Sequence, residues 1–332
     1  MAAAHHLSSS VLPMVAAVVF VFLVPRLRGA RAATFTITNN CGYTVWPGLL
    51  SSAGSAPLST TGFALAPGAS QAVPAPSGWS GRMWGRTLCA ASSADGAGKF
   101  ACATGDCGSG DVQCNGGGAA PPATLAEFTL DGSGGLDFFD VSLVDGYNLP
   151  MLVTPLGASA SSSAPSSGKC AATGCVAELN GACPADLRVA STTSASPVAC
   201  RSACEAFGSA EYCCSGAYGN PNTCRPSAYS QFFKSACPRA YSYAYDDSTS
   251  TFTCAAGATD YSITFCPAAP TSVKSSGQNP QAAGLQQLND TMIYFGGGGG
   301  GPNSSGATTA SSRSPMAAAA AALVAVAVAA LL

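Results

Sequence analysis

Residues 98–114 read GKFACATGDCGSGDVQC, a stretch rich in glycine and cysteine and poor in large apolar side chains. Thr104, Gly105 and Asp106 are typical of a tight turn, in which the Asp106 carboxylate accepts hydrogen bonds from backbone N–H groups. The stretch also contains three cysteines, Cys102, Cys107 and Cys114. The partners of these cysteines constrain how the surrounding chain folds.

All 16 cysteines of the 332-residue chain lie between Cys41 and Cys266. An even, dense set of this kind predicts a framework of disulfide bonds formed in an oxidising compartment. Metal binding by cysteine is the weaker interpretation, because the sequence contains no Cys-x-x-Cys pair. We therefore expect crosslinks, with no metal and no cofactor.

The first 32 residues are typical of a secretory signal peptide. A short apolar run at 11–24 is followed by the small-x-small cleavage sequence ARA at 30–32. The mature chain is then expected to begin at Ala33. Both histidines of the protein lie in the signal peptide, which excludes Ser-His-Asp catalysis, Cys-His catalysis and histidine-containing metal sites in the mature chain.

The C-terminal part has the layout of a GPI-anchor signal. Residues 269–315 are rich in Gly, Ser, Ala, Pro and Gln, which predicts a flexible stalk. Residues 316–332 form an apolar tail that would be removed, and small residues at 303–306 are the candidate attachment site. A single C-terminal membrane helix is the alternative. Asn289 and Asn303 are glycosylation acceptors in the stalk.

Charge narrows the range of partners. Residues 33–268 contain nine basic and fifteen acidic side chains, a net charge of −6. Nucleic acid and anionic lipid headgroups are poor partners for such a surface. The expected protein is a monomer on the extracellular face of the plasma membrane, in the apoplast or cell wall.

Short β-rich runs are separated by Gly, Pro and Ser, which predicts an all-β sandwich or barrel. These runs are at 34–46, 81–87, 125–130, 137–144, 151–154, 251–254 and 261–266. Residues 170–237 differ, because cysteine is dense there and helices are expected at 198–207 and 227–237. We therefore expect a mainly β fold, an antiparallel sandwich or flattened barrel, with a disulfide-rich, partly helical loop subdomain.

Several motifs of residues 33–268 resemble those of the thaumatin-like family of plant pathogenesis-related proteins. The stretch at 98–114 is similar to the family signature Gly-x-Phe-x-Cys-x-Thr-Gly-Asp-Cys. Further similar motifs are NNCGYTVWP at 39–47, GRMWGRTLC at 81–89, PPATLAEFTL at 121–130, DFFDVSLVDGYNLPM at 137–151, EYCCSG at 211–216 and YSITFCP at 261–267. The resemblance implies the family's disulfides, taken in cysteine order: Cys41–Cys266, Cys89–Cys102, Cys107–Cys114, Cys170–Cys254, Cys175–Cys237, Cys183–Cys200, Cys204–Cys213 and Cys214–Cys224.

The resemblance also implies an acidic cleft. The matching positions are Arg82, Glu127, Asp140, Asp145 and Asp246, with Asp247 as the alternative to Asp246. One departure from the family is Arg239, which stands where an aspartate is usual and would weaken the acidity if it bordered the cleft. The long stalk and anchor are a second departure.

Three functions remain open for this cleft. It could bind cell-wall polysaccharide, above all β-1,3-glucan, in an antifungal defence role, and this is the favoured interpretation. It could be a weak endo-β-1,3-glucanase, with Glu127 as general acid and Asp140 or Asp145 as base or nucleophile. The protein could instead be a non-catalytic interaction or signalling partner tethered to the membrane. The sequence does not decide whether it is an enzyme.

The stretch DFFDVSLVDG at 137–146 poses a geometric problem for this cleft. Asp140 and Asp145 differ by an odd number, so an unbroken strand would direct them to opposite faces. If both line one cleft, the chain must bulge or turn between them. Gly146 is the expected place for the turn.

Overall fold

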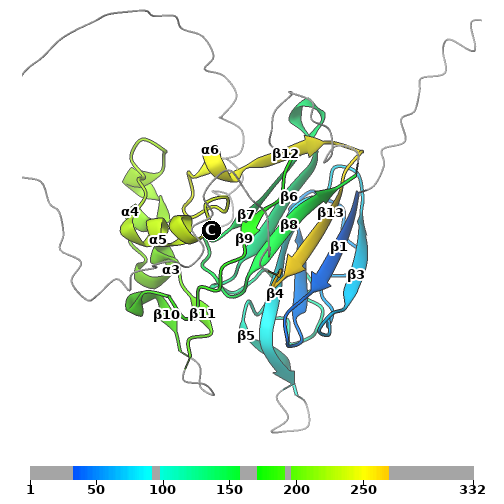
Figure 1. The fold of residues 1–332 in the computed structure, drawn as a ribbon, viewed down its shortest axis with the longest axis horizontal. Helices are drawn as coiled ribbons and strands as arrows, with labels where there is room; N and C mark the ends of the chain where they lie inside the picture. Colours follow the sequence, from blue (N-terminus) through cyan, green and yellow to red (C-terminus); the bar gives the residue numbers. More distant parts are fainter. Residues whose placement is uncertain (1–32, 92–97, 158–169, 191–195, 269–332) are drawn as a thin grey trace, which may run out of the picture. The chain divides into compact units, whose positions relative to one another are not determined.

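The computed structural model describes residues 33–91, 98–157, 170–190 and 196–268. Within these ranges the chain forms two large β-sheets and a group of short helices (Figure 1). The first sheet has the strand order β3-β1-β13-β8-β9, formed by β1 (Ala33–Asn39), β3 (Ser70–Ala75), β8 (Met151–Leu156), β9 (Thr173–Cys175) and β13 (Asp260–Phe265). The second has the order β12-β7-β6-β4-β2, with β5 also paired to β4, and consists of β2 (Trp46–Ser51), β4 (Ser80–Ala91), β5 (Phe100–Thr104), β6 (Leu125–Gly132), β7 (Leu136–Ser142) and β12 (Phe252–Ala255).

Neighbouring strands in both sheets run antiparallel, with the exception of the parallel pair β1–β13, in which Phe35 faces Tyr261. This pair joins the first strand of the fold to its last strand. The Cys41–Cys266 disulfide connects the same two segments. The expected mainly β, largely antiparallel fold is confirmed.

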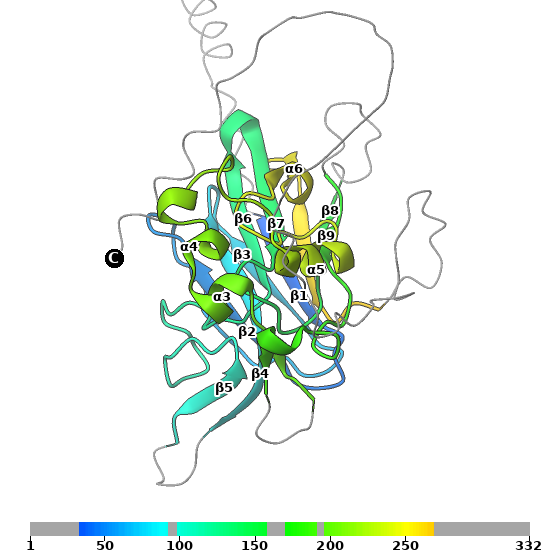
Figure 2. The same cartoon turned by 90° about the vertical axis from the view of Figure 1, so that its left-hand side faces the viewer.

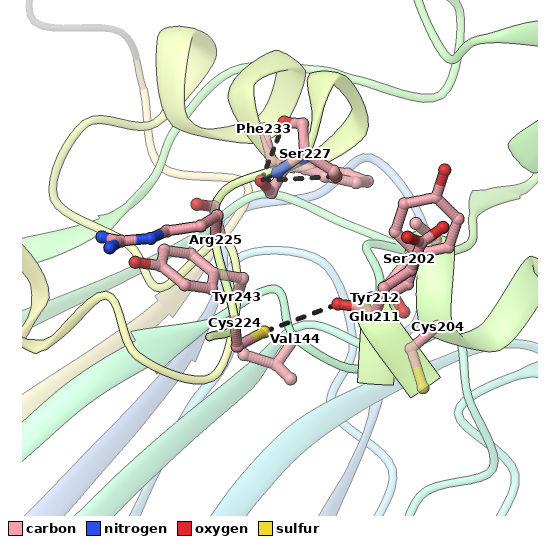
Figure 3. A pocket seen from close by; sticks show the side chains of 13 residues that line it. Val144, Ser202, Cys204, Glu211, Tyr212, Cys224, Arg225, Ser227, Phe233 and Tyr243 are labelled. Atoms are coloured by element: carbon pink, nitrogen blue, oxygen red, sulfur yellow. Dashed lines mark hydrogen bonds between the residues drawn. The ribbon is translucent and has the colours of Figure 1, made fainter. Parts of the chain in front are cut away.

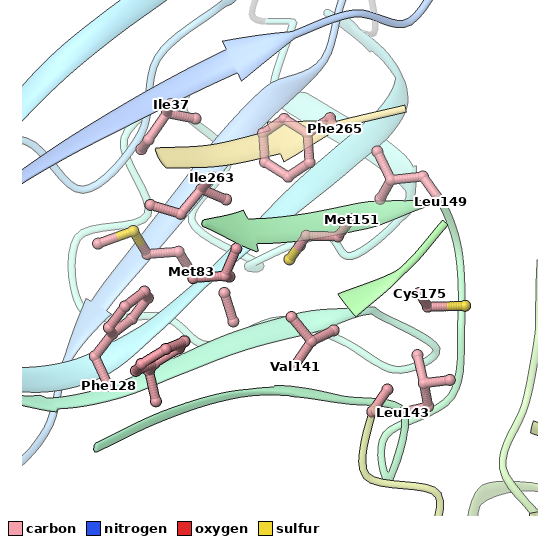
Figure 4. Close-up of a cluster of buried hydrophobic side chains, with 14 of the residues drawn as sticks. Ile37, Met83, Phe128, Val141, Leu143, Leu149, Met151, Cys175, Ile263 and Phe265 are labelled. Carbon is pink, nitrogen blue, oxygen red and sulfur yellow. The ribbon is translucent and has the colours of Figure 1, made fainter. Parts of the chain in front are cut away.

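The main hydrophobic core lies between the two sheets (Figure 4). Alternate residues of each strand enter it, as the two-residue period of a β-strand requires. Phe139 and Val141 of β7 are buried there with Phe128 of β6 and Met83 of β4. On the first sheet the partners include Ile37, Met151, Ile263 and Phe265. The intervening residues of β4, β6 and β7 therefore lie on the other face of the second sheet.

Eight disulfides connect the described chain, and no cysteine within it is free. They are the same eight pairs that the family resemblance implies: Cys41–Cys266, Cys89–Cys102, Cys107–Cys114, Cys170–Cys254, Cys175–Cys237, Cys183–Cys200, Cys204–Cys213 and Cys214–Cys224. Around Cys102 and Cys107, the Asp106 carboxylate accepts hydrogen bonds from the backbone N–H groups of Cys102 and Gly108, as the turn prediction requires.

The short helices gather with the cysteine-dense segment beside the sheets (Figures 1 and 2). They are α3 (Ala203–Phe207), α4 (Ala210–Cys213), α5 (Ala228–Ala236) and α6 (Asp247–Ser250), with 3-10 turns η1 (Ser133–Gly135), η2 (Ala185–Leu187) and η3 (Gly216–Tyr218) and a ribbon of β10 (Arg188–Val189) and β11 (Ala199–Cys200). In these ranges no helix is long and apolar enough to cross a membrane.

The two predicted helices differ in outcome. The helix expected at 227–237 is confirmed as α5, which begins with a capping box between Ser227 and Ser230. The helix expected at 198–207 is wrong in its first half. There Ala199 and Cys200 form strand β11, which pairs with β10. The helix begins only after Ser202, whose side chain accepts a hydrogen bond from the Glu205 N–H.

Asp137 has a structural role. It is the second residue of β7, is only 2% exposed, and accepts hydrogen bonds from the Tyr261 hydroxyl at 2.8 Å and the Asp131 N–H at 3.0 Å. Because Tyr261 belongs to β13, this contact connects the two sheets. Burial raises the pKa of Asp137, although both hydrogen bonds oppose the increase.

We expect the substitution Tyr261→Phe to lower the free energy of unfolding by about 1–3 kcal/mol, because it leaves a buried carboxylate oxygen without its donor. Tyr229→Phe is the matched control, since the Tyr229 hydroxyl donates to Asp186 at an exposed position. It should change stability by no more than about 0.5 kcal/mol. Urea denaturation at neutral pH measures both, and equal losses would contradict the role given to Tyr261.

Candidate functional site

Three charged residues form a row across the second sheet. In the strand register Arg82 of β4 faces Glu127 of β6, and Glu127 in turn faces Asp140 of β7. Side chains directly opposite one another in antiparallel strands have Cβ atoms about 4.5–5.5 Å apart. We call Arg82, Glu127 and Asp140 the charged row. Since their neighbours Met83, Phe128 and Phe139 enter the core, the row lies on the face away from it.

Asp145 joins the row through a turn. Strand β7 ends at Ser142, and the Gly146 N–H then donates to the Leu143 carbonyl at 3.0 Å. Gly146 has φ of 84°, a conformation that favours glycine. The Asp145 carbonyl accepts a hydrogen bond from the Ala123 N–H, which ties the turn to the segment before β6. The turn predicted at Gly146 is confirmed, and the odd spacing of Asp140 and Asp145 is thereby accommodated.

Asp246 precedes α6 and Asp247 is its first residue, and the two have different surroundings. Asp246, 9% exposed, lies 2.8 Å from the Lys234 Nζ and accepts hydrogen bonds from Ser242 and Thr249. Its carboxylate is thus occupied by contacts within the fold. Asp247 is exposed, and its charge is one of those that raise the pKa of Asp140. The alternative assignment, Asp247, is therefore the one that extends the row. We call the charged row, Asp145 and Asp247 the acidic site.

Burial and mutual repulsion both act on the carboxyls of this site. Burial raises the pKa of Glu127, which Arg82 lowers and Asp145 raises further. Burial also raises the pKa of Asp145, and Arg82 opposes that increase. For Asp140 the pKa lies well above its ordinary value, first through burial and then through the charges of Glu127 and Asp247. No cation is among the causes that act on Asp140.

Asp140 also has an unsatisfied oxygen. Its Oδ1 is buried and has no hydrogen-bond partner among the described residues. An ionised carboxylate is costly in such a position, and a protonated one much less so. Arg82 lowers the pKa of Glu127, whereas the charges of Glu127 and Asp247 raise that of Asp140, so Asp140 is the facing carboxyl that holds a proton more readily.

A family profile described as the Thaumatin family matches residues 39–267. The chain belongs to the thaumatin family. Thaumatin-like protein 1 of Arabidopsis thaliana is 58% identical over 250 residues, which cover 74% of this chain and 90% of that protein. A glucan endo-1,3-beta-glucosidase of Prunus avium is 53% identical over 239 residues, covering 72% and 92%.

The chain is also similar to part of a longer protein and to a solved structure. A PR5-like receptor kinase of Arabidopsis thaliana is 50% identical over 242 residues, which are 72% of this chain and 35% of that protein. The solved structure of a thaumatin-like xylanase inhibitor is 26% identical, with a TM-score of 0.36, and covers 70% of this chain and 99% of that one.

Arg239 packs on an aromatic ring of the core-facing edge strand β12. Its guanidinium lies 4.6 Å from the centre of the Phe252 ring, and Phe252 packs on Phe139 from the core side. Burial lowers the pKa of Arg239. It is absent from the charges that shift the pKa of Glu127, Asp140 or Asp145. The expectation that it would weaken the acidity depended on its bordering the cleft, and its packing on Phe252 accounts for the difference.

Tyr241 is a further residue of the site. Its backbone continues the edge of β7, because its N–H donates to the Val141 carbonyl and its carbonyl accepts from the Leu143 N–H. Its hydroxyl donates to Asp247 Oδ1 at 2.8 Å. Tyr241 thus fixes Asp247 beside β7. Only the sequence AYSYAYDD, with tyrosine near the two acids, could have indicated this.

Metal binding finds no support in this geometry. Across the described ranges, no group of three or more His, Cys, Asp or Glu side chains is placed to hold a metal ion. The acidic site offers a set of carboxyl acceptors and a guanidinium donor on the sheet face away from the core, and the pKa of one carboxyl, Asp140, lies well above its ordinary value.

Proposed function

We propose that the acidic site binds a neutral cell-wall polysaccharide of the β-1,3-glucan class, in an antifungal defence role at the cell surface. The observation that carries this is the row of Arg82, Glu127 and Asp140 on adjacent strands, with Asp145 and Asp247 beside it. Carboxylates accept hydrogen bonds from sugar hydroxyls, and the guanidinium of Arg82 donates them. A neutral polymer meets no repulsion from a domain of charge −6.

A second candidate is hydrolysis of the same polysaccharide. It is favoured by the facing carboxyls of Glu127 and Asp140, since a glycosidase needs one protonated and one ionised carboxyl close together. The Prunus avium relative bears the name of a β-1,3-glucosidase. The sequence had suggested Glu127 as general acid. The surroundings of the pair favour Asp140 for that role instead, with Glu127, beside Arg82, as the ionised member.

The two candidates are separated by co-sedimentation with insoluble β-1,3-glucan followed by an assay of released reducing sugar. We expect the protein to bind and to release no more sugar than the double variant Glu127→Gln/Asp140→Asn. Release that disappears in Asp140→Asn would support hydrolysis. Failure to bind any glucan would contradict the proposal and favour a protein partner, such as the extracellular part of a signalling complex.

Location is a separate part of the proposal. We propose export by the signal peptide at 1–32, a stalk at 269–315 glycosylated at Asn289 and Asn303, and a GPI anchor attached near 303–306. These segments lie outside the described residues. Phosphatidylinositol-specific phospholipase C should release the protein from intact cells into the medium. Protein that stays with the membrane after this treatment would indicate a C-terminal membrane helix.

A further inference from the structure

A small pocket opens among the short helices (Figure 3). Its empty space is about 390 Å³, a value that includes open solvent at its mouth. Arg225 and Tyr243 lie together on one side, with Glu211 and Tyr212 on the other and Ser227 and Phe233 above (Figure 3). Cys204 and Cys224 also line it, and their disulfides to Cys213 and Cys214 make its wall rigid.

Two opposite charges line this pocket without pairing. Glu211 and Arg225 are both exposed, and they form no ion pair with each other or with other described residues. Arg225 lies close enough to Tyr243 for its charge to act on the tyrosine hydroxyl. An acceptor and a strong donor held apart across one pocket suit a neutral ligand that both donates and accepts hydrogen bonds. A charged ligand would be repelled by one of the two.

Aromatic rings complete this chemistry. Tyr212 and Tyr243 are half-buried, so each presents part of its ring to the pocket. Pockets with apolar, aromatic walls and a few convergent polar groups are typical binding sites for small organic groups. A hexose has hydroxyls around the edge of its ring and an apolar face, and so matches both features.

The pocket adjoins the acidic site along the chain. Val144 lines the pocket and is followed directly by Asp145, and consecutive Cα atoms are about 3.8 Å apart. On the opposite side Ser242 and Tyr243 line the pocket, directly after Tyr241, which holds Asp247. The charge of Asp247 also acts on the Tyr243 hydroxyl, which places this side of the pocket close to the acidic site.

We propose that this pocket is a second subsite, which takes one further hexose unit of the polysaccharide chain held at the acidic site. Glu211 accepts hydrogen bonds from its hydroxyls, Arg225 donates to them, and the rings of Tyr212 and Tyr243 contact its apolar face. The inference rests on the proposed function. It adds that affinity increases with chain length and that the added affinity depends on residues outside the sheet.

Calorimetric titration of the full chain with a β-1,3-linked glucose disaccharide and hexasaccharide tests this. Wild type should bind the hexasaccharide at least tenfold more tightly. Glu211→Gln and Arg225→Met should each weaken hexasaccharide binding about tenfold, the loss expected for one charge-assisted hydrogen bond, and leave disaccharide binding unchanged. The matched control is Glu205→Gln, an exposed carboxylate of α3 that is not part of the pocket.

The outcomes distinguish the two proposals. Wild type that binds both sugars equally, or pocket variants that bind the hexasaccharide as wild type does, would overturn the subsite and leave the acidic site standing. Wild type that binds neither sugar would overturn the proposed function and the subsite together. Loss of disaccharide binding in Arg225→Met would also contradict the subsite, because it would place Arg225 in the first site.

Discussion

Gly146→Ala should destabilise the protein by about 2–5 kcal/mol, a large loss of stability for a single added methyl group. Two effects add. The residue has φ of 84°, where a side chain is strained. A Cβ there would also lie 2.6 Å from the Pro122 Cβ and 2.7 Å from the Cys200 carbonyl oxygen, so the backbone must shift.

Gly134→Ala is the matched control for the strain alone. Gly134 has φ of 72° in the turn between β6 and β7, and a Cβ there would meet nothing within 4 Å. We expect it to cost only about 1 kcal/mol. Urea denaturation of both variants gives the comparison. Equal costs would show that the close contact of the Asp145 turn with Pro122 and Cys200 is not what holds the turn in place.

Asp140→Asn should raise the free energy of unfolding at neutral pH by about 1–3 kcal/mol, an unusual gain for a change at a buried position. A carboxyl whose pKa is higher in the folded state binds its proton more tightly there. Its contribution to stability is therefore fully present below the unfolded pKa, about 3.9, and is lost as the pH rises through the folded pKa. Asparagine removes that loss.

The pH dependence tests this directly. The gain in Asp140→Asn should be present at pH 7 and should disappear below about pH 4, where the wild-type carboxyl is protonated in both states. Glu127→Gln should behave in the same direction with a smaller gain, because Arg82 already offsets part of the cost. The exposed control Glu205→Gln should stay within about 0.5 kcal/mol at either pH. Destabilisation of Asp140→Asn at pH 7 would mean that its carboxylate is a stabilising part of the fold.

If a carboxylate belongs to a functional site, removal of its charge is expected to stabilise the fold, since unfavourable charges are retained at such sites for binding or chemistry. Removal of a carboxylate that forms ion pairs and hydrogen bonds within the fold is expected to destabilise the protein instead. Asp246, with its ion pair to Lys234 and its hydrogen bonds, illustrates the structural case. The adjacent residues Asp246 and Asp247 thus differ in kind.

Sequence reasoning could identify which residue types belong to the acidic site but not how they meet. Arg82, Glu127 and Asp140 come from three strands, and they form a row only because the register sets them opposite one another. Register depends on the packing of whole strands and is not readable from one segment. Asp246 and Asp247 could not be separated for a similar reason, because only the folded chain buries the first and leaves the second exposed.

The alternation of β7 and the turn at Gly146 were predictable, since both depend on local geometry. The early start predicted for the helix at 198–207 was wrong because pairing of Ala199 and Cys200 with β10 outweighs their local helical preference. The pocket near Val144 was not predictable at all. Its lining comes from the β7 turn, α3, α4, α5 and the segment before α6, which only the folded chain brings together.

The most direct test of the acidic site is the affinity of the full chain for a β-1,3-linked glucose hexasaccharide, measured by calorimetry with Glu127→Gln beside Glu205→Gln. Each variant replaces a glutamate carboxylate with the isosteric amide, but only Glu127 lies in the charged row. We predict that Glu205→Gln binds as wild type does and that Glu127→Gln binds about 10–100-fold more weakly. Equal binding by all three proteins, or no binding by wild type, would contradict the assignment of polysaccharide recognition to the acidic site.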